Sequence, residues 1–338
     1  MKRRCNGRRR LLEAGLAVLP VARFGALGSA AALVASPVHA DTWPSKPIKL
    51  IVPYPPGGQT DIVSRWLGEK LSPILGQPIV IENKAGAQGI VGLQAGKQAA
   101  PDGYTLIYAN VSNLLINKFA YAKLPYDTSD FEMVTQLGLS VLGMVVQKEM
   151  GVKNVAEFID KVRNTRTKAS FASFGAGSSS HLYGEMFNGA AKLDMVHVPY
   201  KGAGPAVQDI VGGIATMGIQ DFAATKAFRD AGRLQVLAVT GPKRWPLDPD
   251  VPTFAEQGFP LDLAGFNGIV APKGTPRPIV ERVSNEINKL IQSKAGTEKL
   301  LQMGLLATGT TPAQFQAEID RDLPRWGEVF RKTGLTPQ

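Results

Sequence analysis

Two histidines, His181 and His197, are the best candidates for acid–base chemistry after residue 40 of this sequence. His181 ends the stretch GAGSSSH, so a pair with Ser178 or Ser180 would have the composition of a hydrolase nucleophile and its base. His181 also precedes Glu185 by four residues, and on a helix this spacing favours a local His–Glu contact. His197 lies in the apolar stretch MVHVPYK, which indicates a hydrogen-bonded core imidazole. We therefore expect no enzyme activity, with a serine hydrolase as the alternative.

Other catalytic and metal-binding motifs are missing from the sequence. It contains no HExxH pair, no GxSxG elbow and no phosphate-binding P-loop. Its one cysteine, Cys5, cannot build a disulfide or a thiolate zinc site. The stretch GAGSSS approximates a GxGxxG dinucleotide fingerprint, but that signal is weak by itself. We expect neither a metal nor a cofactor.

Four loops rich in glycine and in hydroxyl or amide side chains indicate a different chemistry, the binding of an anion. They span residues 55–60, 83–89, 173–180 and 200–207, and each lies between a predicted strand and a predicted helix. In a parallel sheet such loops meet at the carboxyl ends of the strands, where helix N-termini present unpaired N–H groups. One helix dipole contributes only about 0.3–1 kcal/mol at an exposed site, so several donors must converge. For any single loop, tight-turn geometry without a function is the alternative.

Asp61 complicates this prediction, because a carboxylate near the start of a helix would repel an anionic ligand if it faced the cleft. We expect Asp61 to cap the helix, with Thr60 as the competing cap. Both residues nevertheless stay among the predicted contacts.

The elements that must position these loops alternate along the chain. Strands are predicted at 48–53, 78–82, 105–110, 131–137, 141–147, 169–174, 195–200, 215–220, 234–240 and 266–271. Helices are predicted at 61–75, 88–99, 154–164, 179–192, 204–213, 222–232, 277–292 and 312–332. Asn154 with Glu157, and Thr311 with Gln314, fit the spacing of capping boxes. The alternation is typical of α/β folds with parallel strands.

Residues 1–40 have the layout of an export signal, with a basic start, an apolar stretch and PVHA before Asp41. We expect cleavage after Ala40 rather than a membrane anchor, because Arg23 leaves no run of about 18 apolar residues. Seven of the 38 Lys and Arg residues and one of the 28 Asp and Glu residues lie in this segment, so the remainder carries +4 instead of +10. The remainder has no dense basic run, so nucleic acid is not an expected partner.

Several stretches resemble the Bug family, the periplasmic substrate-binding receptors of tripartite tricarboxylate transporters. They include PIKLIVPYPPGGQTDIVSRWLGEKL, APDGYTLIYAN, SHLYGEMF, HVPYKGAGPAVQDIVGG and GIVAPKGTPRPIVERVSNEINKL, in order from about Trp43 to the final helix. The resemblance implies an α/β fold of the two-lobed type II periplasmic binding protein class. Each lobe would be a mostly parallel sheet flanked by helices, with the ligand cleft between the lobes. We expect residues 41–144 and 263–338 in lobe one and residues 145–262 in lobe two.

The resemblance also implies a function and a location. The protein would be a periplasmic solute receptor that captures a small carboxylate by hinge closure and delivers it to permease subunits of a tripartite tricarboxylate transporter. We expect a monomer. The alternatives are a periplasmic serine hydrolase and a ligand sensor for a membrane signalling partner. The ligand stays open among aliphatic di- and tricarboxylates, aromatic acids, amino acids and nicotinic-type compounds.

In the family, a PxGG turn and a hydroxyl-rich loop hold the carboxylate through backbone amides, hydroxyls and bridging waters. The ligand-binding residues that this implies here are Tyr54, Pro56, Gly57, Gly58, Gln59, Thr60, Asp61, Asn110, Ser112, Ser173, Gly175, Gly177, Ser178, Tyr200, Lys201, Gln220 and Asp221. Two positions depart from the family pattern. Gln220 and Asp221 stand where an aspartate followed by asparagine is common, and Lys84-Ala85 replaces the usual Arg-Pro. Our central prediction is that amides from both lobes, including those of Gly57 and Gly58, grip an anion.

Overall fold

Strand β1 (Ile48–Val52) shows why the chain folds in layers. In the computed structural model, which describes residues 43–338, Ile48 and Leu50 pack into one core and Ile51 into another on the opposite face of the sheet. A strand that is buried on both faces needs helices on both sides of its sheet. The predicted export signal and its cleavage after Ala40 lie outside the described residues.

The first sheet has six strands. Their order is β11 (Leu305–Ala307), β4 (Phe131–Ser140), β10 (Gly265–Pro272), β3 (Thr105–Asn110), β1 and β2 (Ile79–Asn83). One face packs against α1 (Gln59–Leu75), α8 (Arg277–Gln292) and α9 (Lys294–Gln302). The other face packs against α2 (Ile90–Lys97), α3 (Asn117–Ala120) and α10 (Pro312–Lys332). These layers fix the direction in which α1 leaves β1.

The second sheet has five strands. Their order is β7 (Val196–Pro199), β6 (Ser170–Ser173), β8 (Met217–Asp221), β5 (Leu142–Gln147) and β9 (Leu234–Val239). Helix α6 (Ala203–Val211) covers one face. Helices α4 (Val155–Asn164) and α5 (Ser179–Ala190) pack into the core on the other face, while α7 (Phe222–Asp230) follows β8 directly.

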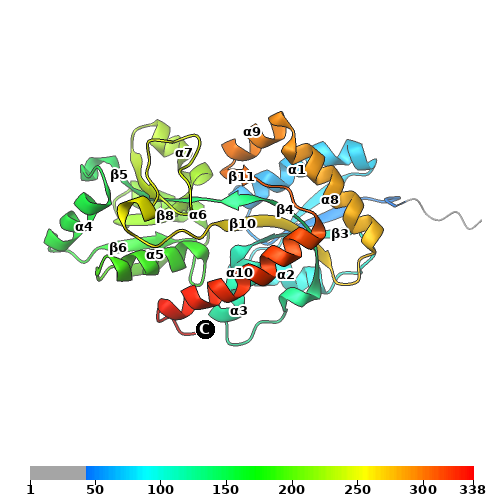
Figure 1. The fold of residues 1–338 in the computed structure, drawn as a ribbon, viewed down its shortest axis with the longest axis horizontal. Coiled ribbons are helices and arrows are strands. Elements are labelled where there is room, and N and C mark those ends of the chain that lie inside the picture. The colour runs from blue at the N-terminus through cyan, green and yellow to red at the C-terminus, as the bar shows by residue number, and fades with distance from the viewer. Residues whose placement is uncertain (1–42) are drawn as a thin grey trace, which may run out of the picture. The chain divides into compact units, whose positions relative to one another are not determined.

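The two sheets are joined by extended chain. Strand β4 ends at Ser140 and β5 begins at Leu142, so a nearly continuous strand leaves the first sheet and enters the second (Figure 1). Strand β10 brings the chain back to the first sheet. Helix α10, red in Figure 1, contacts both β4 and α5 and so packs against elements of both sheets. None of the helices within residues 43–338 combines the length and the apolar character needed to cross a membrane.

The α/β class and the predicted strands and helices are confirmed, but the strand pairing needs a correction. Both sheets are mixed. In the first sheet, β10 runs antiparallel to β3 and to β4. In the second sheet, β5 runs antiparallel to β8 and to β9. Strand β11, helix α9 and the π-helical turn Ser112–Ile116 were not predicted. The predicted capping box at Thr311 is present. The one predicted at Asn154 is incomplete, because the Glu157 carboxylate accepts from the N–H of Lys153 and not from that of Asn154. The predicted boundary at 144/145 falls inside β5, and the lobe limits stay a prediction.

Candidate functional site

A cavity of about 970 Å³ lies where loops from the two sheets meet. Its wall includes the turn between β1 and α1, the end of β3, and the starts of α5, α6 and α7. The predicted residues that line it are Tyr54, Pro56, Gly57, Gly58, Gln59, Thr60, Asn110, Ser112, Ser178, Tyr200, Lys201 and Asp221. The predicted residues absent from the wall are Asp61, Ser173, Gly175, Gly177 and Gln220.

Helices α1 and α6 begin at the cavity and have open N-termini. Helix α1 starts after Gly58 and helix α6 starts after Gly202, and neither has a side-chain cap. The first N–H groups of a helix have no acceptor inside the helix. Within residues 43–338, no protein atom accepts a hydrogen bond from the N–H of Gln59 or Thr60 on α1, or from that of Ala203 on α6. Each end therefore offers free N–H donors and the positive end of a helix dipole.

Two further helices that begin at the cavity, α5 and α7, are capped by side chains, whereas Gly89, the N-cap of α2, also lines the cavity and has no side-chain cap. Ser178 caps α5 by accepting the N–H of His181 at 3.2 Å, and Ser112 Oγ accepts the N–H of Ser179 at 3.1 Å. Asp221 caps α7 by accepting the N–H of Ala224 at 2.8 Å. The donors available for an anion therefore come mainly from α1 and α6.

The Gly57 amide, which we predicted to bind the ligand, donates to a protein acceptor in this structure, and its contact with a ligand stays a prediction. The Gly57 N–H donates to Asp61 Oδ2 at 3.0 Å, and the same carboxylate accepts bonds from Arg65 and Asn83. Burial raises the pKa of Asp61, but the bonds from Arg65, Gly57 and Asn83 outweigh it and hold the pKa below its usual value. Gly58 caps α1, so neither Asp61 nor Thr60 is its N-cap. Asp61 instead fixes the turn in front of the helix.

Parts of the hydroxyl-rich loop face the first sheet instead of the cavity. A Cβ on Gly175 would lie 1.9 Å from Gln88 Nε2, and one on Gly177 would lie 2.9 Å from Ala120 Cβ. Both glycines have positive φ values, 136° and 77°, which side chains rarely adopt. These glycines therefore permit close approach of the two sheets, and their direct contact with a ligand stays a prediction.

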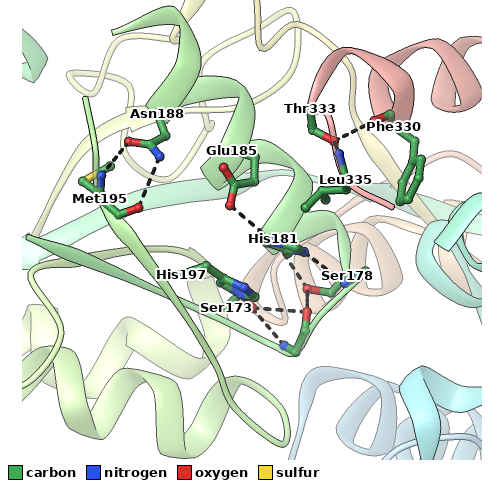
Figure 2. Close-up of polar contacts among 12 residues, drawn as sticks. Ser173, Ser178, His181, Glu185, Asn188, Met195, His197, Phe330, Thr333 and Leu335 are labelled. Atoms are coloured by element: carbon green, nitrogen blue, oxygen red, sulfur yellow. Dashed lines mark hydrogen bonds and ion pairs between the residues drawn. The ribbon is translucent and has the colours of Figure 1, made fainter. Parts of the chain in front are cut away.

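The two histidines stack beneath this loop (Figure 2). Their ring centroids are 3.7 Å apart, with 14° between the planes. His181 accepts from the Gly177 N–H and lies 3.4 Å from Glu185, and His197 Nε2 lies 2.6 Å from Ser173 Oγ. The predicted His–Glu contact and the hydrogen-bonded His197 are thus confirmed.

The geometry does not support a Ser–His nucleophile at the cavity. Ser178 Oγ donates to Gly175 O at 2.7 Å, and Ser180 Oγ donates to Ile219 O at 2.5 Å, so neither hydroxyl meets the His181 ring. Ser173 does contact an imidazole, but its side chain is fully buried and does not line the cavity.

His197 gives the fold a pH dependence that can be measured. Burial and the neighbouring His181 lower the pKa of His197 from 6.5 to about 3. The folded chain therefore binds fewer protons than the unfolded chain between these values. Its stability should be full above pH 6.5 and fall as the pH drops toward 3, by at most about 1.4 kcal/mol per pH unit and less because the ring is partly exposed.

We expect His197→Gln to remove part of this pH dependence, since glutamine does not titrate. Urea unfolding of both proteins at a series of pH values between about 7.5 and 4 measures the effect. The two stability profiles should converge as the pH falls. Parallel profiles would contradict a depressed pKa at this position.

Hydrogen bonds join the loops of one sheet to the loops of the other at the edge of the cavity. Gln88 Nε2 donates to Phe174 O at 3.2 Å, and the Ser179 N–H donates to Ser112 Oγ at 3.1 Å. Gln88 precedes α2, whereas Phe174 follows β6. The two walls are therefore held together directly on one side of the cavity.

Charged groups are scarce in this cavity. Among its described lining residues, Lys201 and Asp221 are the only Lys, Arg, Asp or Glu side chains. Lys201 is exposed, whereas Asp221 is 6% exposed. Burial raises the pKa of Tyr54 to about 12, so its hydroxyl stays protonated and donates to Asn110 Oδ1 at 3.2 Å. Most of the remaining wall is small or apolar.

Sequence reasoning missed Asn267, Tyr183 and Phe266 in the wall. Asn267 lies in β10 opposite Asn110 and is 3% exposed, and no hydrogen-bond partner for its side chain is found in the described chain. A lone amide in the apolar strand GFNGIVAP was the available signal. Tyr183 and Phe266 carry no such signal, because their apolar neighbours make them look like ordinary core. Across residues 43–338, no three His, Cys, Asp or Glu side chains gather as metal ligands would.

Comparison with known proteins finds a matching family and similar sequences and structures. Residues 63–335 match the family described as "Tripartite tricarboxylate transporter family receptor". Protein BugT of Bordetella pertussis is 36% identical over 308 residues, which cover 90% of this chain and 94% of that protein. A structure of an R. palustris protein with adipate has a TM-score of 0.84 and 32% identity, covering 88% of this chain and 100% of the other. MatC from Rhodopseudomonas palustris with bound malate has a TM-score of 0.78 and 28% identity, covering 85% and 99%.

Proposed function

This chain belongs to the receptor family of tripartite tricarboxylate transporters, as its motifs indicated, and we propose that it captures a small carboxylate in the cavity and delivers it to the permease subunits of such a transporter. Members of the family are receptors and not enzymes. We place the protein in the periplasm, in line with its periplasmic structural neighbours, and propose cleavage of the export signal after Ala40.

One observation carries the proposal: free N–H groups from helices of opposite sheets border the same cavity. Gln59 and Thr60 belong to the helix that follows β1, and Ala203 begins the helix that follows β7. An anion that bridges them would accept bonds from both sides, in a setting with few competing charges. The adipate and malate bound by the structural neighbours are small carboxylates of the expected kind.

We further propose that binding proceeds by hinge closure of two lobes, with the hinge in the crossing strands. The Gln88–Phe174 and Ser112–Ser179 bonds would then form on closure and add to the affinity of the closed state. The lobe limits that we propose are those predicted from the sequence, residues 41–144 with 263–338 and residues 145–262. The permease would recognise the closed form.

A thermal-shift screen of small carboxylates tests the proposed function. A ligand at 100 times its dissociation constant stabilises the folded state by about 2.7 kcal/mol. We expect at least one of adipate, malate, hexanoate, benzoate and their amino derivatives to raise the melting temperature. The matched neutral amides at equal ionic strength serve as the control and should have no effect. If a neutral or cationic compound raised the melting temperature and every carboxylate failed, the proposal would be wrong.

A further inference from the structure

Asp221 is the feature of the cavity that carboxylate capture leaves unexplained. It is 6% exposed, lines the cavity and is the N-cap of α7, where it accepts the N–H of Ala224 at 2.8 Å. Within residues 43–338, Asp221 forms no ion pair with a Lys, Arg or His side chain. A buried carboxylate without a counter-ion is unfavourable, and it repels any anion that enters the same space.

The surroundings of Asp221 favour a ligand that carries a positive charge. Burial raises the pKa of this carboxyl group, while backbone N–H groups at the start of α7 act against the rise. A ligand ammonium within hydrogen-bond distance would favour the charged carboxylate further, whereas a ligand carboxylate would do the opposite. The ammonium would also provide the counter-ion that the protein lacks here.

The free N–H donors of α1 and the Asp221 carboxylate come from loops of different sheets, whereas the third free donor, Ala203, belongs to the same sheet's loops as Asp221. The free N–H groups of Gln59 and Thr60 start the helix that follows β1 of the first sheet, while Asp221 ends β8 of the second sheet. Strand β5, which pairs Leu142 with Asp221, joins the two sides. A ligand that contacts both the α1 donors and Asp221 would therefore carry a negative group and a positive group at separate positions. Aromatic side chains also line the cavity, among them Tyr54, Phe174, Tyr183, Phe228 and Phe266.

From this distribution we propose that the ligand is an amino carboxylate, with a carboxylate at one end, an ammonium at the other and an apolar body between, and that Asp221 selects the ammonium. The proposal rests on the proposed receptor function and narrows its ligand class. Aromatic walls fit both parts of such a molecule, because they bury the apolar body and attract the cation through their ring faces. A dicarboxylate would instead bring its second charge toward Asp221.

Two matched sets of compounds test the proposal by titration calorimetry. The first set is hexanoate, 6-aminohexanoate and adipate, and the second is benzoate, 4-(aminomethyl)benzoate and terephthalate. Each set keeps the first carboxylate and the body and changes only the far end. We expect the amino member of at least one set to bind at least about tenfold tighter than the other two members.

The variant Asp221→Asn supplies the matched control. Asparagine is as good an N-cap as aspartate and nearly the same size, so helix α7 should keep its start and the melting temperature should change little. We expect the advantage of the amino member to disappear and the dicarboxylate to bind at least about tenfold tighter than it binds the unmodified protein.

Three results would overturn the amino carboxylate proposal. The first is that neither amino member binds. The second is that the simple acid or the dicarboxylate binds most tightly in both sets. The third is that Asp221→Asn keeps the same preference for the amino member. If any simple acid or dicarboxylate still binds, the receptor function stands and only the ligand class is wrong. If the thermal-shift screen and both sets show no binding of any carboxylate, the receptor function itself fails.

Discussion

Replacing Gly58 by aspartate should weaken carboxylate binding by at least about 100-fold and leave the fold stable. Gly58 is the N-cap of α1 with an extended backbone, φ −78° and ψ 168°, and a Cβ there would meet only Pro55 O, at 3.9 Å. An N-cap aspartate accepts from the N–H groups of the first turn, including that of Thr60. The new carboxylate would therefore occupy the proposed anion site and repel the ligand by about 4 kcal/mol at about 4 Å.

Titration calorimetry and thermal unfolding of Gly58→Asp measure the two parts of this prediction. The matched control is Gly58→Ala, which adds the same Cβ without a charge or an acceptor. Alanine caps poorly and can cost a few tenths of a kcal/mol, but binding should stay within about fivefold of the unmodified protein. Equal affinities for the two variants would show that the start of α1 does not hold the carboxylate.

Truncation of Trp326 to alanine should cost about 3–5 kcal/mol of unfolding free energy. Trp326 lies on α10, is 1% exposed and packs edge-on against Tyr183 of α5, with ring centroids 5.6 Å apart. Because α10 also packs on β4, the tryptophan helps to connect elements of the two sheets. Tyr183 lines the cavity, so the ligand affinity should fall as well.

Urea unfolding followed by circular dichroism tests the effect of Trp326→Ala. The control is Arg325→Ala, the neighbouring residue of α10, whose side chain is half exposed and pairs with Asp322 at 3.2 Å. Exposed ion pairs contribute about 0–1 kcal/mol, so this variant should lose far less stability. Similar losses for the two variants would contradict the packing role of Trp326.

The sequence predicted the elements of this fold well because their signals are local. The short apolar run Ile48–Val52 identified β1, and the helical spacing of Val283 and Ile287 identified α8. The pairing of strands could not be predicted in the same way. Leu142 pairs with Asp221, which is 79 residues away along the chain, and nothing in either segment specifies the other. The mixed sheets follow from such long-range pairings.

The site was predicted in part for the same reason. Glycine loops between strands and helices are visible in a sequence, and they led to the starts of α1 and α6. The pairing of the Gly57 N–H with Asp61 was not foreseen, because a glycine at the N-cap offers no side chain and so no capping-box pattern marks this turn. Asn267 reaches the cavity only because β10 pairs with β3. Its position depends on the tertiary fold, which local reasoning does not reach.

A crystal structure of the protein with the carboxylate that gives the largest thermal shift tests the central claim most directly. We predict that the carboxylate oxygens lie within about 3.2 Å of the backbone nitrogen of Gln59 or Thr60, and that a donor from the second sheet's loops completes the contact. A ligand whose carboxylate turns away from the start of α1, with those nitrogens bound only to solvent, would contradict the account.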